Sequence, residues 1–390
     1  MQWSVESPVK LLLVSRSWPL TERSGVSLAA AAHAEMLVES GHSVAIVGAH
    51  PSVLHEGLGA ARRYHVQASG SGALYSPGRV DRDALRAAIG EFNPQLVITE
   101  AWQTALTDAA IEIAHELRIP VLMVSHGVSL HPFTEQLRDR ARALAWCFYR
   151  WYRLPRLVAK LSAVTTLSES ARTQRFHDRD LARRLGKPVH KLGNFPVHWR
   201  APVLARAQRE AKIVVVGYFS AVKNQLSALE VLRLLPTALR LVFVGPRAGA
   251  YYDACANRAA AWGLLPRVSF LEDSECDLAE EIGSSLMLLS TSVTEALPIC
   301  LLEGMASGTP VVATPVGAVP DLGAGLLSAS PSGQANAAVA LWQDAVLWEQ
   351  ESRKGLLAHE ARFSRERVKQ DLDAAVALTV GSTAPERLSN

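Results

Sequence analysis

The sequence lacks the features that mark several large classes of protein. Its four cysteines form no CxxC pair, so we expect reduced, structural thiols and no zinc or redox motif. They are Cys147, Cys255, Cys276 and Cys300. The longest apolar runs, such as 11–14 and 213–217, are far shorter than the roughly 18 residues of a membrane-spanning helix and predict buried strands. The first ten residues carry no basic segment followed by a long apolar one, which predicts a cytoplasmic protein without an export signal.

Length, composition and charge fit a folded protein of more than one domain. The 390 residues are 49% apolar and 20% charged, and this length predicts about two to three domains. The overall charge of +3 hides an asymmetry, because residues 1–200 carry +7 and residues 201–390 carry −4. We therefore expect one half to face an anionic surface or substrate, and not a protein that coats nucleic acid.

Apolar strands alternate with helices along most of the chain. The first half predicts strands at 10–15, 42–48, 93–100 and 119–127, with helices at 27–40 and 111–118. After a proline-containing linker at 195–210, the same order restarts at 211–220 and runs to a strand at 309–315. Near-continuous apolar strands separated by helices indicate parallel sheets covered on both faces. The fold class is therefore α/β, with two doubly wound units and the ligand site expected at the carboxyl ends of the strands, in a cleft between them.

The segment 291–322 is the most informative for chemistry. Glu295 precedes a helix expected to begin near Pro298, and Glu303 lies about two turns into that helix. The free amides at the start of the helix, in Ala296, Leu297 and Ile299, would offer partial positive charge to a phosphate. Glu303 would hydrogen-bond a pair of vicinal hydroxyls such as a ribose diol, or it would simply solvate a helix face.

This segment, TSVTEALPICLLEGMASGTPVVATPVGAVPDL, resembles the retaining glycosyltransferases of family 4, in the glycosyl transferases group 1. The resemblance implies the GT-B fold of two facing Rossmann-like domains and extends over nearly the whole chain. It implies an acceptor-side domain at 1–200 and a nucleotide-sugar-binding domain at 201–365. A last helix at 366–390 would cross back to the first domain and end in a tail.

The resemblance also assigns roles to single residues. Glu295 and Glu303 match the Glu-x7-Glu motif of the family. In GYFSAVKN, Lys223 matches the lysine that holds the donor diphosphate, whereas Tyr218 stands where the family has an arginine. One cation and the helix amides would then have to neutralise the diphosphate.

Three further residues are candidates on weaker patterns. His126, followed by Gly127, matches the histidine that the family places beside the donor sugar, although a histidine at a strand end is often a core residue. Gly25, at the start of the first helix, would approach a phosphate or the acceptor. Asn194 is either a residue of the site near the domain junction or an ordinary turn asparagine.

Residues 138–160 combine basic and aromatic side chains. Seven lysines and arginines stand against one acid, with five aromatic residues between them. This pattern suits the headgroup layer of an anionic membrane, which predicts peripheral attachment to its cytoplasmic face, and equally suits a core helix with a solvated basic face. A nucleic-acid partner is not expected, because no binding module is recognisable.

The predicted function is retaining transfer of a sugar from a nucleotide-diphosphate sugar to a saccharide or lipid-linked saccharide in glycan biosynthesis. His126, Glu295 and Lys223 are the predicted catalytic residues, and no metal or other cofactor is expected. The predicted donor-binding residues are Glu303, Ala296, Leu297, Pro298, Ile299, Tyr218, Asn194 and Gly25. Two alternatives are a nucleotide-sugar epimerase, which would change the donor without an acceptor, and a non-catalytic partner subunit, which the tyrosine at 218 suggests.

Overall fold

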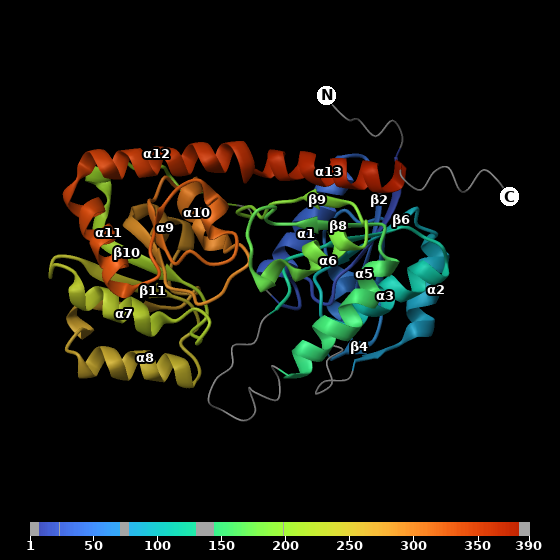
Figure 1. Cartoon of the computed structure of the whole chain (residues 1–390), viewed down its shortest axis with the longest axis horizontal. Helices are drawn as coiled ribbons and strands as arrows, with labels where there is room; N and C mark the ends of the chain where they lie inside the picture. The colour runs from blue at the N-terminus through green and yellow to red at the C-terminus, as the bar shows by residue number, and fades with distance from the viewer. Residues whose placement is uncertain (1–7, 23, 71–77, 130–143, 198, 382–390) are drawn as a thin grey trace. The chain divides into compact units, whose positions relative to one another are not determined.

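The computed structural model describes residues 8–22, 24–70, 78–129, 144–197 and 199–381. The chain divides into two compact units, and the first is discontinuous in sequence (Figure 1). The first unit comprises Met1–Gly193 and Val368–Asn390, and the second comprises Asn194–Arg367. The boundaries expected from the sequence were residues 200 and 365.

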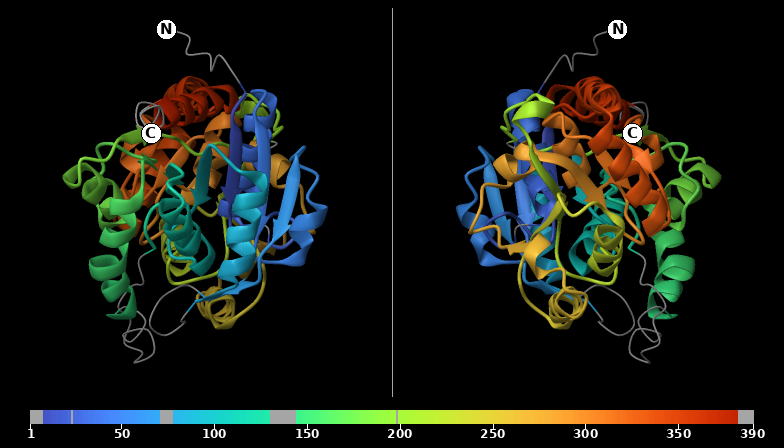
Figure 2. Two further views of the ribbon diagram at one scale, coloured as in Figure 1. Left: turned by 90° about the vertical axis from the view of Figure 1, so that its right-hand side faces the viewer. Right: turned by 90° about the vertical axis from the view of Figure 1, so that its left-hand side faces the viewer.

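The first unit is built on a seven-stranded sheet with the order β3-β2-β1-β6-β7-β8-β9, in which every pair of neighbours is parallel. Its strands are β1 (Lys10–Val14), β2 (Ser43–Gly48), β3 (Arg62–His65), β6 (Leu96–Glu100), β7 (Val121–Val124), β8 (Ala163–Thr166) and β9 (Val189–Lys191). The blue strands of this sheet, β1 to β3, stand side by side in the left view of Figure 2. A separate antiparallel pair joins β4 (Ala68–Ser69) to β5 (Arg79–Val80). Strand β6 is buried at all five positions, as expected of a strand covered on both faces.

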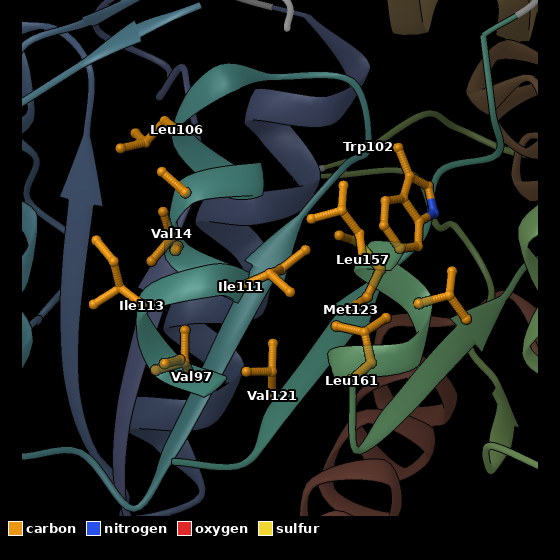
Figure 3. Packing of buried hydrophobic residues seen from close by; sticks show 14 of the residues in the cluster. Val14, Val97, Trp102, Leu106, Ile111, Ile113, Val121, Met123, Leu157 and Leu161 are labelled. Atoms are coloured by element: carbon orange, nitrogen blue, oxygen red, sulfur yellow. The ribbon is translucent and has the colours of Figure 1, made fainter. Parts of the chain in front are cut away.

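Helices cover this sheet and close its core. They are α1 (Gly25–Glu39), α2 (Arg82–Phe92), α3 (Ala105–Glu116), α5 (Leu154–Lys160) and α6 (His177–Arg184). Polar side chains cap the starts of α1, α2 and α3. At the beginning of α3, for example, Thr104 accepts a hydrogen bond from the Thr107 amide. Figure 3 shows the core side chains, in which α3 and α5 pack onto the apolar residues of β1, β6 and β7. This packing fixes the carboxyl ends of the central strands, where the candidate residues of this unit lie.

The C-terminal helix α13 (Arg365–Gly381) packs on the first unit although it is far from it in sequence. The Ser40 hydroxyl, directly after α1, donates to the Asp373 carboxylate at 2.8 Å, and Lys369 Nζ pairs with the same carboxylate at 2.9 Å. Leu372 is fully buried beside these polar contacts. A polar clamp over a buried apolar face therefore attaches α13 to this unit.

The second unit is built on a six-stranded sheet with the order β12-β11-β10-β13-β14-β15, again parallel throughout. Its strands are β10 (Glu210–Val216), β11 (Arg240–Val244), β12 (Val268–Leu271), β13 (Ser285–Ser290), β14 (Val311–Ala313) and β15 (Leu326–Leu327). Its helices are α7 (Gln225–Leu234), α8 (Ala250–Ala261), α9 (Leu278–Ser284), α10 (Ile299–Ala306), α11 (Pro331–Gln343) and α12 (Ala345–Arg362). In Figure 1, α7 and α8 lie on one face of the sheet, and α9 and α10 lie on the other. The order reverses between β10 and β13, which places the loops after these two strands next to each other.

The predicted α/β class with two parallel sheets is confirmed. The last helix, expected within 366–390, is α13, which begins at Arg365 and which the structure describes to Gly381. Residues 331–362 form α11 and α12. No helix was predicted there, because their apolar residues show little periodicity. No described helix is both long and apolar enough to cross a membrane.

The attachment of α13 gives a stability prediction. Leu372→Ala removes a fully buried side chain and should lower the free energy of unfolding by about 2–5 kcal/mol, because the cavity collapses only partly. Leu378→Ala, in the same helix at 48% exposure, should change it by less than about 0.5 kcal/mol. Urea denaturation followed by circular dichroism measures both, and equal effects of the two variants would contradict the packing described for α13.

Candidate active site

The loops after β10 and β13 are joined by hydrogen bonds at the carboxyl edge of the second sheet. The Thr291 hydroxyl donates to the carbonyls of Lys223 and Asn224 at 3.2 and 2.9 Å, and the Val293 amide donates to the Val222 carbonyl at 2.8 Å. The Thr314 hydroxyl, after β14, donates to the Ser292 carbonyl at 2.6 Å. Three loops that are distant in sequence are therefore fixed together at one edge, as expected for an open parallel sheet.

Two predicted catalytic residues form an ion pair in this loop cluster. Lys223 Nζ lies 2.7 Å from Glu295 Oε1, with the side chains 27% and 14% exposed. The Ser292 hydroxyl donates to the same oxygen of Glu295 at 2.9 Å. The pair is thus positioned by hydrogen bonds while both groups remain accessible to a ligand, and each charge balances the other. An anion that approached Lys223 would enter a site already oriented for it.

Glu303 lies in α10 beside this pair, but its environment differs. It is the fifth residue of the helix, a little over one turn from the start and not two as expected. Its carboxylate makes no hydrogen bond or ion pair with any residue that the structure describes, and burial raises its pKa to about 7. A partly buried carboxylate without a protein partner is available to a ligand hydroxyl.

The neighbouring thiol of Cys300 shows how close these groups lie. Burial raises its pKa to about 12, while the charge of Lys223 lowers it and those of Glu303 and Glu295 raise it further. These charges influence the thiol because all four side chains share one region. The raised pKa makes Cys300 an inert packing residue, in line with the structural role expected for the cysteines.

The start of α10 presents backbone amides at this site. Pro298 is the residue before the helix and not part of its first turn, and α10 begins at Ile299. No hydrogen bond leaves the amides of Ala296 and Leu297 to any described residue, and the first amides of a helix have no intrahelical partner. The Asn194 side-chain amide donates to the Leu297 carbonyl at 3.0 Å and is itself buried. Asn194 therefore orients the loop that carries the candidate phosphate-binding amides.

Glycines allow the loops of the site to approach one another. Gly317 has φ +57°, and a Cβ there would lie 2.0 Å from the Glu295 carbonyl oxygen. Gly217 has φ +135°, and a Cβ there would lie 3.2 Å from Cε of Lys223. Neither glycine was predicted from the sequence as a residue of the site. Only glycine combines the left-handed conformation with such close contact.

Tyr218 lies at the same edge but takes no part in the cluster. Its side chain is 61% exposed, and its backbone carbonyl accepts a hydrogen bond from the Gln225 side chain at 2.9 Å. Lys223, Glu295, Glu303, Asn194 and residues 296–299 are thus the predicted residues that the second unit brings together.

The two remaining predicted residues lie in the first unit. Gly25 is the first residue of α1, which Ser24 caps through a reciprocal bond with Ser27. His126 follows β7, and its Nε2 lies 2.8 Å from Oε2 of the buried Glu100. The other oxygen of Glu100 contacts Nδ1 of His33 at 2.9 Å. The sequence analysis missed Glu100 and His33. The sequence did hold one signal for each residue. Glu100 is an acid at the end of the apolar strand 93–100, and His33 is a lone histidine in an alanine-rich helix.

The described residues contain no group of three or more histidine, cysteine, aspartate or glutamate side chains arranged to hold a metal ion. The positive groups that the structure does place at the candidate site are Lys223 and the amides before α10.

Comparison with known proteins supports the resemblance found in the sequence. Residues 210–344, most of the second unit, match the family model of glycosyl transferases group 1. No curated protein matches the chain in sequence. The recognition is confirmed at the level of a region similar to glycosyl transferases group 1 in the second unit of a chain that has the GT-B fold. Membership of family 4 stays a prediction.

Solved structures share the fold over nearly the whole chain at low identity. The sucrose-phosphate synthase of Thermosynechococcus elongatus has a TM-score of 0.75 and 17% identity, covering 96% of this chain and 100% of that one. HepE of Anabaena, solved in complex with UDP-glucose, has a TM-score of 0.67 and 14% identity, covering 95% and 100%. A glycosyltransferase of Rickettsia africae has a TM-score of 0.69 and 15% identity, covering 97% and 99%. Such identities establish the fold alone.

Gly317 supplies a test of how the site loops are built. Gly317→Ala should lower the free energy of unfolding by about 3 kcal/mol or more, because a left-handed alanine costs about 1–2 kcal/mol and its Cβ also clashes with the Glu295 carbonyl. Gly263→Ala is the matched control, with φ +66° and open space around the added Cβ. It should show only the conformational cost. Thermal unfolding of both variants measures the difference, and equal losses would contradict the close contact with residue 295.

Proposed function

We propose that the protein is a retaining, metal-independent glycosyltransferase that moves a sugar from a nucleotide-diphosphate sugar to a saccharide or lipid-linked saccharide. The observation that carries the proposal is the cluster of Lys223, Glu295 and Glu303 beside the free amides before α10. In this cluster, Lys223 and the amides could bind a diphosphate, and the carboxylate of Glu303, which has no partner among the described residues, could bind a diol. The match of residues 210–344 to glycosyl transferases group 1 supports the same reaction class.

Each group has a role that follows from its chemistry. Lys223 and the amides near Leu297 stabilise the charge that develops on the diphosphate as the anomeric bond breaks. Glu295, released from Lys223 when the diphosphate binds, accepts hydrogen bonds from sugar hydroxyls. Glu303 holds the ribose diol. The role of His126, contact with the donor sugar, is what the family resemblance implies. The acceptor hydroxyl attacks on the face from which the diphosphate leaves, as the family resemblance implies.

The first experiment is an assay with a donor alone and with acceptors. HepE of Anabaena was solved with UDP-glucose, so this nucleotide sugar is the first donor to test. Isothermal titration calorimetry should detect its binding, and a set of saccharide acceptors should give a glycosylated product that keeps the anomeric configuration of the donor. A changed nucleotide sugar formed without acceptor would replace the proposal with epimerisation. Absence of binding by any nucleotide sugar would contradict it.

The raised pKa of Glu303 predicts how donor binding depends on pH. The ionised carboxylate is the stronger acceptor for a diol, so donor binding favours it and releases a proton near pH 7. UDP-glucose affinity should therefore rise by about tenfold from pH 6 to pH 8. Glu303→Gln should weaken binding by roughly 10–100-fold at pH 8 and remove this pH dependence.

Glu230→Gln is the control for this experiment, because it makes the same change at an exposed position of α7 in the same unit. It should keep both the affinity and the pH profile. A parent protein whose affinity is flat between pH 6 and 8, or falls, would contradict the role assigned to Glu303.

We also propose that the first unit, the predicted acceptor-side domain, binds an anionic membrane through the segment 144–160. Within 144–160, Phe148, Trp151 and Tyr152 are exposed, while Trp146 and Tyr149 are buried in the core. The guanidinium of Arg150 lies 5.1 Å from the centre of the Trp151 ring, and that of Arg156 lies 3.5 Å from that of Tyr152. One face of this segment therefore packs in the core, as expected if it is a core helix. The opposite face combines aromatic rings with cations, as an interfacial segment would.

The cations of this segment differ in their structural roles. Residues 138–143 of the predicted basic segment lie outside the described residues. Arg153, whose side chain is 38% exposed, also has a structural role, because its Nε donates to the buried Asp108 at 2.7 Å. Arg150 and Arg156 are the cations that test the membrane proposal.

The double variant Arg150→Ser/Arg156→Ser should bind anionic vesicles roughly 30-fold more weakly, at about 1 kcal/mol for each arginine. Binding should also become less sensitive to salt. The control Arg62→Ser/Arg82→Ser makes the same charge change elsewhere in the first unit and should bind like the parent. Co-sedimentation with vesicles containing phosphatidylserine measures all three, and a parent protein that stays in the supernatant at low salt would rule the membrane role out.

A further inference from the structure

A buried carboxylate joins two histidines in the first unit. Glu100, the last residue of β6, has no solvent-exposed side-chain surface. Its Oε1 lies 2.9 Å from Nδ1 of His33 in α1, and its Oε2 lies 2.8 Å from Nε2 of His126 after β7. The two imidazole rings face each other at a centroid distance of 6.4 Å and an angle of 21°. Each carboxylate oxygen therefore serves one ring.

The charge of Glu100 determines where the protons lie. Burial by itself would raise the pKa of Glu100, but the two histidines outweigh it and lower the pKa to about 2. The group is then ionised at neutral pH, and an ionised carboxylate accepts hydrogen bonds without donating any. Both contacting nitrogens must therefore carry a proton, Nδ1 of His33 and Nε2 of His126.

This arrangement leaves one nitrogen of His126 for other partners. Nδ1 of His126 makes no hydrogen bond to any residue within the described ranges. Because the ring proton is held on Nε2 by Glu100, Nδ1 of the neutral ring carries a lone pair and acts as an acceptor. The His126 side chain is 11% exposed, whereas His33 is enclosed at 3%, so only His126 is open to a ligand.

The loop that carries His126 is itself held rigidly. The Ser125 hydroxyl donates to the buried Asp178 carboxylate at 2.5 Å, and Asp178 also accepts from Trp102 Nε1 at 2.7 Å. The Gln103 side chain accepts from the Ser129 amide at 2.7 Å, on the far side of His126. These bonds fix the loop on both sides of the histidine.

Strain in the neighbouring backbone points to the same place. Ala101 and Gln103, the first and third residues after Glu100, have φ of +65° and +67°. Non-glycine residues in this conformation cost about 1–3 kcal/mol each and cluster at functional sites. The strained turn directs β6 into the network that holds the loop.

We propose that Glu100 is a positioning residue that fixes His126 in the tautomer with the proton on Nε2, so that Nδ1 accepts a hydrogen bond from a hydroxyl of the donor sugar. His33 occupies the second oxygen of Glu100 and holds the carboxylate in place. The identity of the ligand rests on the function proposed above, whereas the tautomer does not. A sugar hydroxyl is the fitting partner, because it donates to a neutral imidazole nitrogen.

The tautomer is tested by nuclear magnetic resonance of the full-length chain labelled with ¹⁵N in histidine, using His126→Asn to assign the signals. When its ring is neutral, His126 of the parent protein should show a protonated Nε2 and an unprotonated Nδ1. Glu100→Gln offers one oxygen and one amide group to two rings that both need an acceptor. At least one of His33 and His126 must then change tautomer or lose its bond.

Two further variants keep the test decisive. Glu100→Asp withdraws the carboxylate by one methylene and serves if the glutamine variant fails to fold. Glu116→Gln makes the same change as Glu100→Gln at an exposed position of α3 and should leave all histidine signals unchanged. A parent His126 with its proton on Nδ1, or histidine signals that are identical in Glu100→Gln and the parent, would overturn the proposal.

The kinetic consequence separates this inference from the proposed function. If UDP-glucose is turned over, Glu100→Gln should raise the KM for the donor roughly tenfold, the value of one hydrogen bond, while Glu116→Gln keeps the parent KM. A change of the His126 tautomer without any donor turnover in the parent would support the positioning role and contradict the proposed function. Normal turnover with an altered tautomer and unaltered KM would remove Nδ1 from sugar binding and overturn the inference.

Discussion

Parallel strands that are buried on both faces leave a chain few places for charged side chains. In both units the central strands are mostly apolar, so polar groups gather where those strands end. The ion pair of Lys223 and Glu295 lies in the loops after β10 and β13, and Glu100 and His126 lie at the ends of β6 and β7. Burial of the sheets thus determines both where chemistry is possible and which loops contribute to it.

The two clusters handle charge in different ways. Lys223 and Glu295 are partly exposed and neutralise each other, so a ligand anion can replace one partner at small cost. Glu100 is fully enclosed and depends on two imidazole donors to remain ionised. Glu303 lies between these extremes, with a raised pKa and no protein partner. A fixed carboxylate suits positioning, whereas an exchangeable pair and an unpartnered carboxylate suit ligand binding.

The segment around Trp151 shows how one stretch of sequence meets two demands. Tyr149 donates from its hydroxyl to Asp108 at 2.8 Å, and the same hydroxyl accepts from the Gln103 amide at 3.3 Å. Gln103 in turn holds the loop of His126 through Ser129. The buried side of the basic and aromatic segment is therefore linked by hydrogen bonds to the loop of a predicted site residue, while its exposed side faces outward. The buried face agrees with the interpretation of this segment as a core helix, whereas attachment of the exposed face to a membrane stays a proposal.

The sequence by itself determined the alternation of strands and helices, because apolar runs, glycine and proline act locally. It also determined the Glu295 and Glu303 motif, since its spacing and flanks are contiguous in the chain. Tertiary structure alone decided that Lys223 pairs with Glu295 across 72 residues, that Gly317 contacts the Glu295 carbonyl, and that Arg153 binds the buried Asp108. It alone joined His33, Glu100 and His126, which three separate elements supply. Such contacts depend on which strands become neighbours in a sheet, and no local pattern records that order.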